Sequence, residues 1–142
     1  GLNYMRNKSH IRDVLVTCGD AFVLPNRMIK KLLKALDDID HVKMKRLGTR
    51  IPVTTPWRVD TELLEILEES NDKKPVRVVT QINTAQEITP ISKNAFKRIS
   101  KSVSAVLNQA VLLKGIPAPD EFRFRSDFKR NQRYQGENVE TV

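Results

Sequence analysis

The sequence predicts an α/β fold, a partial (β/α) barrel of about four parallel strands with helices outside the sheet. Short, largely apolar runs predict strands that are buried on both faces. Amphipathic stretches of roughly 10–14 residues separate these runs and predict helices. Strands and helices therefore alternate, which is typical of parallel βαβ units. The pattern alone fits an open sheet or half of a (β/α)₈ barrel.

The first strand is predicted over residues 11–17 and leads into a turn of small residues. That turn, Thr17-Cys18-Gly19-Asp20, carries one carboxylate at the carboxyl end of the strand. Ligands bind at this end of the strands in α/β folds. The turn is therefore the first candidate site, and a plain capping turn is the alternative interpretation.

A helix is predicted over residues 28–39, where apolar residues recur at helical spacing and lysines lie opposite them. The next strand is predicted over residues 41–49, although Lys43, Lys45 and Arg46 lie within it. Charges inside a strand predict an edge position or contact with a ligand or partner.

The following segment, residues 51–57, contains two prolines and is predicted to be extended. Asp60 then has the position and chemistry of a helix N-cap, which predicts a helix over residues 61–70. The polar residues 71–75 are predicted to form a loop.

The third strand is predicted over residues 76–82. Thr89 followed by Pro90 predicts the start of a helix that ends near residue 101. A fourth strand is predicted over residues 103–113. Beyond the regular part, which spans residues 1–116, we expect residues 117–142 to form an irregular polar arm or tail.

Composition limits the function classes. The net charge of +8 favours an anionic partner such as RNA or another phosphate polyanion, with solubility alone as the alternative. Cys18 is the only cysteine, so no internal disulfide or metal site is predicted, and the cytoplasm or an organelle matrix is expected. His10 and His41 have no paired nucleophile. No apolar stretch approaches the roughly 20 residues of a membrane span, so no membrane contact is expected.

Five short landmarks, in order, resemble the lysine 2,3-aminomutase family of radical S-adenosylmethionine (SAM) enzymes. The likeness covers about residues 3–116, which correspond to the middle of the family's chain. The landmarks are Arg12-Asp13-Val14-Leu15 with Gly19-Asp20; His41-Val42 with Arg46-Leu47-Gly48-Thr49-Arg50 and Pro52-Val53; Arg58-Val59; Thr80-Gln81-Ile82-Asn83 with Glu87-Ile88-Thr89-Pro90; and Asn108-Gln109 with Val111-Leu112-Leu113-Lys114-Gly115.

The resemblance implies a partial β/α barrel and three cofactors in the family: SAM, a 4Fe-4S cluster and pyridoxal phosphate. The cluster-binding C-x-x-x-C-x-x-C motif is absent here, as is the downstream lysine that holds pyridoxal phosphate. Thiolates are the ligands of such a cluster. We therefore expect no catalytic residue in these 142 residues, and no cofactor held by this chain alone.

The resemblance also implies a SAM-binding wall. The turn residues would meet the amino group of SAM, although Cys18 replaces a family glycine. Gln109 would face SAM, and Gln81 stands where many members carry a histidine. Arg46 and Arg50 could hold a phosphate or carboxylate. The predicted site comprises Thr17, Cys18, Gly19, Asp20, Arg46, Arg50, Gln81, Asn108 and Gln109.

Two functions remain open. The chain is a segment of a radical aminomutase, an isomerase, that is inactive by itself. Alternatively it is a degenerate relative, a pseudoenzyme kept as a structural or interaction protein in a larger assembly such as a ribonucleoprotein. Either function predicts that missing chain segments or partner subunits cover the edges of the half barrel, because exposed edges promote association.

Overall fold

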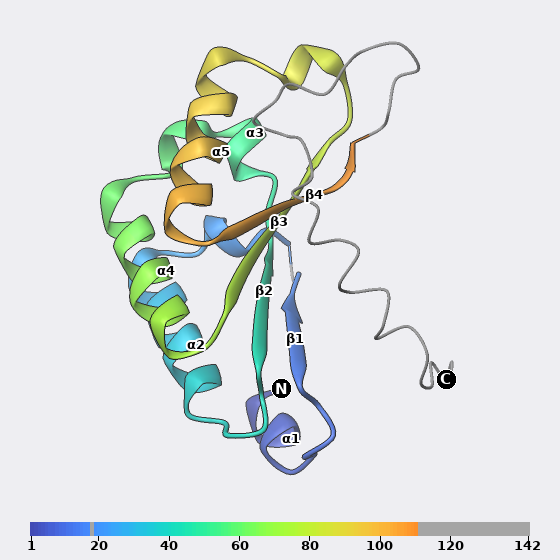
Figure 1. Ribbon diagram of the computed structural model, residues 1–142, viewed down its shortest axis with the longest axis vertical. Coiled ribbons are helices and arrows are strands. Elements are labelled where there is room, and N and C mark those ends of the chain that lie inside the picture. The colour runs from blue at the N-terminus through green and yellow to red at the C-terminus, as the bar shows by residue number, and fades with distance from the viewer. Residues whose placement is uncertain (18, 111–142) are drawn as a thin grey trace.

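A computed structural model describes residues 1–17 and 19–110, with side chains described as far as residue 105. Its centre is a sheet of four parallel strands in the order β1-β2-β3-β4. The prediction of an α/β fold built from parallel βαβ units is confirmed (Figure 1). The strands are β1 (Asp13–Val16), β2 (Met44–Gly48), β3 (Val76–Ile82) and β4 (Ser104–Ala110).

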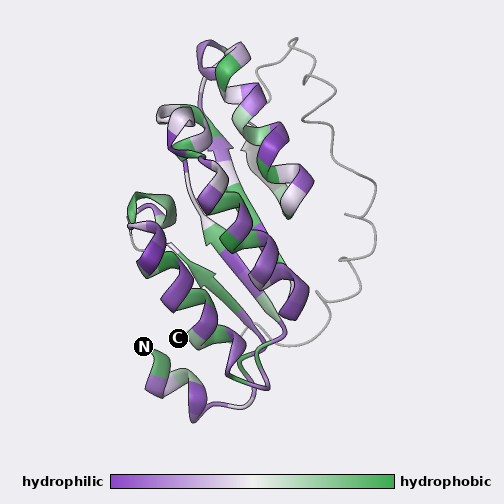
Figure 2. Ribbon diagram, turned by 90° about the vertical axis from the view of Figure 1, so that its left-hand side faces the viewer, coloured by the Kyte–Doolittle hydropathy of each residue, from purple (hydrophilic) through white to green (hydrophobic). Residues whose placement is uncertain are grey.

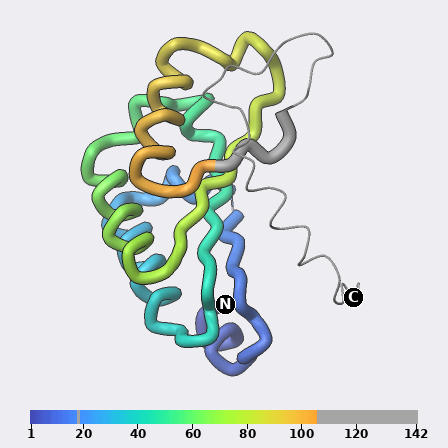
Figure 3. The backbone as a smooth tube through the Cα atoms, viewed as in Figure 1, coloured from blue at the N-terminus to red at the C-terminus, as the bar shows by residue number. Residues whose placement is uncertain are grey.

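Three helices connect the strands, and all three lie on one side of the sheet (Figures 1 and 3). They are α2 (Asn26–Asp37), α4 (Thr61–Lys73) and α5 (Pro90–Ser102). Helices on a single side are the arrangement of a β/α barrel rather than of a doubly wound sheet. The shorter helical elements are α1 (Leu2–Arg6), η1 (Ala21–Val23), α3 (Ile51–Thr54), η2 (Pro56–Arg58) and η3 (Ala85–Glu87).

The hydrophobic core lies between the sheet and these helices. Leu47, Val76 and Val78 project from the strands and are at most 1% exposed. They share one apolar cluster with Leu33 of α2 and Ile99 of α5. Burying each such side chain contributes about 1.5–3 kcal/mol. The outer faces of the helices are mainly hydrophilic, as Figure 2 shows. No helix in the described part of the chain has the length and apolar character needed to cross a membrane.

Both predicted helix caps are confirmed. Asp60 Oδ1 accepts a hydrogen bond from the Leu63 N–H at 2.7 Å. Thr89 Oγ1 accepts one from the Ser92 N–H at 3.1 Å, and Ser92 Oγ accepts one from the Thr89 N–H at 2.9 Å. The predicted loop over residues 71–75 is partly wrong, since α4 continues to Lys73.

The prediction of an extended segment over residues 51–57 is wrong. This segment contains α3 and the start of η2, and each begins with a proline in its first two positions. The first N–H groups of a helix have no intrahelical acceptor, so a proline at these positions loses no hydrogen bond. Proline therefore starts a helix as readily as it ends one. Strand β2 is also shorter than predicted, because Val42 N donates to Ile39 O in a turn and β2 begins at Met44.

Strand β2 is an interior strand, so the edge alternative is wrong. One of its cations, Lys45, is fully buried on the helix side. Lys45 Nζ forms an ion pair with Asp37 of α2 and donates to Ser70 O at 3.0 Å and Ser70 Oγ at 2.5 Å. Burial lowers the pKa of Lys45 from 10.5, and the hydrogen bond to Asp37 opposes that change. Lys45 therefore satisfies its charge within the chain.

Candidate functional site

A cavity of about 370 Å³ lies at the carboxyl ends of β1, β2 and β3. Five of the predicted site residues come together there, from three separate strand ends. The residues that line the cavity are Thr17, Gly19, Asp20, Gly48, Thr49, Arg50, Val79, Thr80 and Gln81.

Two glycines shape the part of the cavity between β1 and β2. Gly19 has φ +73°, a left-handed conformation that other residues rarely adopt. At Gly48 a Cβ atom would lie 3.2 Å from Thr17 Cγ2, tighter than ordinary van der Waals contact. Gly48 thus lets the end of β2 lie close to the end of β1.

The Asp20 carboxylate joins the turns that follow β1 and β2. Oδ1 accepts hydrogen bonds from Phe22 N at 2.9 Å and from Thr49 Oγ1 at 2.5 Å. Oδ2 accepts one from Arg50 N at 2.6 Å. A carboxylate offers about four acceptor positions, so these three bonds leave Asp20 with little unused capacity.

Arg50 contributes the guanidinium of the cavity. One of its terminal nitrogens donates to Glu87 Oε1 at 2.8 Å, and the side chain is 38% exposed. Its Nε is buried and has no hydrogen-bond partner among the residues that the structure describes. Glu87 also accepts from Asn83 N at 2.8 Å, and this bond, followed by Arg50, lowers the Glu87 pKa below 4.5.

Thr80 supplies a second unsatisfied polar group. Its Oγ1 is buried and has no partner within the described part of the chain. Thr49, Thr80 and Gly48 were missed in the sequence, although each lies within two residues of a predicted site residue at a strand end. Including the two residues on either side of each predicted residue at a strand end would have identified all three.

The other predicted residues have different positions. Gln81 is exposed in the cavity and its Nε2 donates to Asn83 Oδ1 at 2.8 Å. Arg46 does not line the cavity, and its Nε instead donates to Asp13 Oδ1 at 2.9 Å. Asn108 and Gln109 lie in β4, beside β3, but their side chains fall outside the described residues, as does Cys18.

The cavity therefore offers a carboxylate, a guanidinium, hydroxyl groups and an amide. This set suits a small polar ligand that carries one positive and one negative group. An ammonium group pairs with a carboxylate, and an oxyanion pairs with a guanidinium. Within the described ranges, no group of three His, Cys, Asp or Glu side chains could hold a metal ion.

Comparison with known proteins finds relatives that include glutamate and L-lysine 2,3-aminomutases. The chain is 41% identical over 115 residues to a glutamate 2,3-aminomutase of Clostridioides difficile (strain 630), which is 81% of this chain and 26% of that protein. It is 35% identical over 115 residues to an L-lysine 2,3-aminomutase of Methanococcus maripaludis, covering 81% and 26%. It is 37% identical over 113 residues to an L-lysine 2,3-aminomutase of Bacillus subtilis (strain 168), covering 80% and 23%.

The chain thus spans about a quarter of the length of these curated relatives. No protein-family profile matches it.

Proposed function

The matched residues of this chain belong to the lysine 2,3-aminomutase family, and we propose that they form one wall of a SAM site in an amino acid 2,3-aminomutase. The observation that carries the proposal is that Thr17, Gly19, Asp20, Arg50 and Gln81 converge on one cavity. The cavity lies at the carboxyl ends of parallel strands, where α/β folds bind their ligands.

The charges of the cavity match the two charged groups of the methionine part of SAM. Asp20 retains about one acceptor position for the ammonium group. Arg50 is partly exposed and has donors left for the carboxylate. The exposed Gln81 amide is available for neutral polar atoms. On the family resemblance we assign Cys18, Asn108 and Gln109 to the same wall.

The iron–sulfur cluster does not fit this chain. Such a cluster needs thiolate ligands, and the 142 residues contain one cysteine. We therefore propose that the cluster and pyridoxal phosphate are held by other parts of the protein, and that these residues are inactive by themselves. The lone cysteine also favours a reducing compartment, the cytoplasm or an organelle matrix.

The test is calorimetric titration of SAM into the native protein and two variants. Asp20→Ala is expected to abolish SAM binding, whereas Asp13→Ala removes a carboxylate of the same sheet outside the cavity and should leave the affinity unchanged. Because Asp20 also joins two turns, Gln81→Ala provides a second variant whose side chain is exposed. It should weaken binding without changing the free energy of unfolding. Unaltered SAM affinity in both cavity variants would contradict the proposal.

The second candidate is a non-catalytic structural or interaction protein that uses its basic surface. On α2, Lys30 pairs with Glu69 at 2.9 Å. Arg27, Lys31 and Lys34 have no ion-pair partner among the described residues. Cations of this kind suit RNA phosphates and need no catalytic geometry.

The intact mass of the native protein, with whatever co-purifies, separates the two functions. A much heavier chain with bound iron supports the enzyme. A chain of about 16.3 kDa that carries RNA or many proteins, without iron, supports the structural role.

A further inference from the structure

Glu87 contacts a side chain of the cavity but does not line the cavity itself. Its Oε1 accepts a hydrogen bond from a terminal nitrogen of Arg50 at 2.8 Å. Its Oε2 accepts one from Asn83 N, also at 2.8 Å. Both carboxylate oxygens are thus in use, and together they join the turn after β2 to the turn after β3. Glu87 therefore holds a cavity side chain from outside the cavity.

The main chain at Glu87 is fixed as well. Glu87 is the last residue of η3, and its carbonyl oxygen accepts a hydrogen bond from Ser92 Oγ at 2.9 Å. Ser92 is buried and belongs to the capping box at the start of α5. Glu87 is therefore anchored to a buried helix cap, which gives its carboxylate a defined position from which to orient Arg50.

Arg50 is a side chain that gains from such support. It is 38% exposed, so packing alone does not fix its conformation. A flexible side chain loses rotamer entropy when it binds a ligand, and a side chain that is already held loses less. The ion pair with Glu87 also leaves donors unused, since Arg50 Nε has no partner among the described residues. Arg50 is thus held by one nitrogen and free to bind through others.

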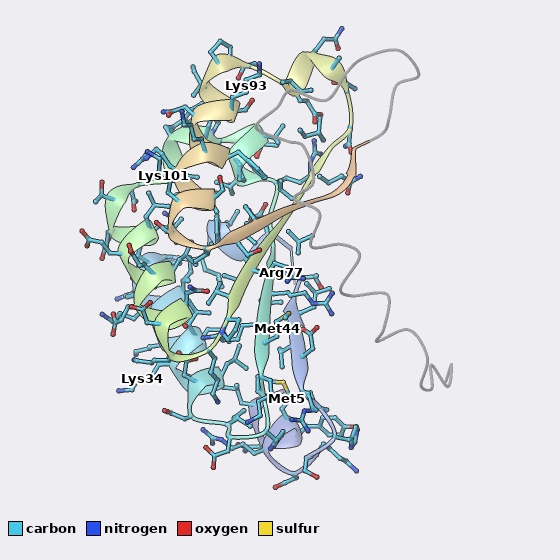
Figure 4. The ribbon with its side chains drawn as sticks, viewed as in Figure 1. Met5, Lys34, Met44, Arg77, Lys93 and Lys101 are labelled. Carbon is cyan, nitrogen blue, oxygen red and sulfur yellow. The ribbon has the colours of Figure 1, made fainter. Side chains whose placement is uncertain are left out.

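The pairing of Glu87 is selective. Lys93 lies near the start of α5 (Figure 4), close to Glu87 in the sequence, and within the described structure it forms no ion pair with Glu87. The anchor of Glu87 contacts the cavity too, because Asn83 Oδ1 accepts a hydrogen bond from Gln81 Nε2 at 2.8 Å. One network of hydrogen bonds therefore connects Arg50 and Gln81, two side chains of the cavity.

We propose that Glu87 is a positioning residue of the site, which holds the Arg50 guanidinium in the orientation that receives the carboxylate of SAM. The inference rests on the proposed function, in which Arg50 binds that carboxylate. A group that is oriented before the ligand arrives contributes more to affinity, because the cost of ordering it is not incurred on binding. Glu87 acts on the ligand through Arg50.

Calorimetric titration of two ligands into the native protein tests the proposal. SAM is compared with its decarboxylated form, which keeps the adenosine, the sulfonium and the ammonium but has no carboxylate. Glu87→Gln keeps the size of the side chain, but an amide presents one acceptor oxygen where Glu87 uses two. We expect SAM to bind about 10-fold more weakly, the effect of losing one charge-assisted hydrogen bond. The decarboxylated form should bind with unchanged affinity.

Glu69→Gln is the matched control. Glu69 is also a carboxylate in an ion pair, with Lys30 at 2.9 Å and Lys73 at 3.7 Å, and it does not line the cavity. The substitution changes the net charge by the same amount as Glu87→Gln. It should leave the affinities for both ligands unaltered, which separates the position of Glu87 from a general effect of charge.

A double variant shows whether Glu87 acts through Arg50. In an Arg50→Ala background, Glu87→Gln should have no further effect on SAM affinity, because the side chain that it orients is gone. Two losses that add in full would mean that Glu87 acts by another route, and they would overturn the proposal.

Three further results would also overturn it. SAM affinity that is unchanged in Glu87→Gln means that Arg50 needs no support. Tighter binding means that Glu87 competes with the ligand for Arg50. Equal weakening of both ligands indicates a general loss of structure in the turn. In all three cases the wild type still binds SAM and Asp20→Ala does not, so the proposed function survives. A wild type that does not bind SAM defeats the proposed function, and this inference with it.

Discussion

Arg50 N donates to Asp20 Oδ2 at 2.6 Å across 30 residues of sequence. The bond joins the turn after β1 to the turn after β2, and the Thr49 hydroxyl donates a second hydrogen bond to the same carboxylate. The residue that the family resemblance assigns to SAM is thus also the residue that joins two sides of the cavity. The proposed SAM site therefore predicts that ligand affinity and local stability are coupled through Asp20, and variants at this position must be measured for both.

Asp20→Ala is expected to lower the free energy of unfolding by about 2–4 kcal/mol. The change removes the acceptor of three hydrogen bonds, and bonds to charged groups contribute about 1.5–3 kcal/mol each, less what solvent recovers. Urea denaturation measures the change. Asp13→Ala, which breaks an exposed ion pair, should cost at most about 1 kcal/mol, and an equal loss in both would be evidence against the joining role of Asp20.

Lys45→Ala is expected to destabilise the fold by about 3–5 kcal/mol, because it leaves Asp37 beside the core without its cation. The triple variant Lys45→Met, Asp37→Leu, Ser70→Ala should recover most of that loss, since well-packed apolar residues replace buried ion pairs with little penalty. Chemical denaturation of the two proteins gives the comparison. A triple variant no more stable than the single one would show that the network itself is required.

Glu87 gives a pH dependence. Its pKa is lowered below 4.5 by Asn83 N and Arg50, so the folded state holds the carboxylate charged more strongly than the unfolded state does. The resulting stabilisation is fully present above pH 4.5 and is lost as the pH falls through the lowered pKa. Thermal denaturation of wild type and Glu87→Gln should therefore differ at pH 7, and the difference should shrink as the pH falls below 4.5. A difference that stays constant over the whole acid range in which the protein is folded would exclude Glu87 ionisation as its source.

Gly19 should tolerate asparagine better than alanine. At φ +73° a residue with a Cβ is strained by roughly 1–2 kcal/mol, and asparagine occupies this region more readily than alanine does. Apart from its chain neighbours, no atom of the described residues lies within 4 Å of the added Cβ, so the strain is conformational. Comparison of Gly19→Ala with Gly19→Asn by denaturation measures it, and equal stabilities would show that the backbone relaxes.

Local patterns predicted the parts of the fold that depend on neighbouring residues. Strand β3 has its predicted bounds, and Asp60 and Thr89 cap the helices as predicted. In both caps the acceptor and donor are three residues apart, a distance over which sequence patterns are informative. The prolines at 52 and 56 were misjudged because proline is compatible both with extended chain and with a helix start.

The candidate site depended on how far along its strand each residue lies. Sequence order placed Arg46 near the cavity, but Arg46 lies two residues before Gly48, away from the carboxyl end of β2, and pairs with Asp13. The charge of Lys45 suggested an edge strand because no counter-charge for a buried position could be recognised in the sequence. Its partners Asp37 and Ser70 lie 8 and 25 residues away. Partners at such separations are supplied by tertiary packing, and no local pattern reveals them.

The strand order β1-β2-β3-β4 repeats the order of the chain, and this has a kinetic consequence. Each pairing closes a loop that contains a single long helix, so no strand has to wait for a distant one to be synthesised. Folding rates rise as contacting residues come closer in sequence. The sheet can therefore grow strand by strand as the polypeptide leaves the ribosome, each new strand adding to a template that already exists. A circular permutant that moves β1 behind β4 would lose this order and should fold more slowly.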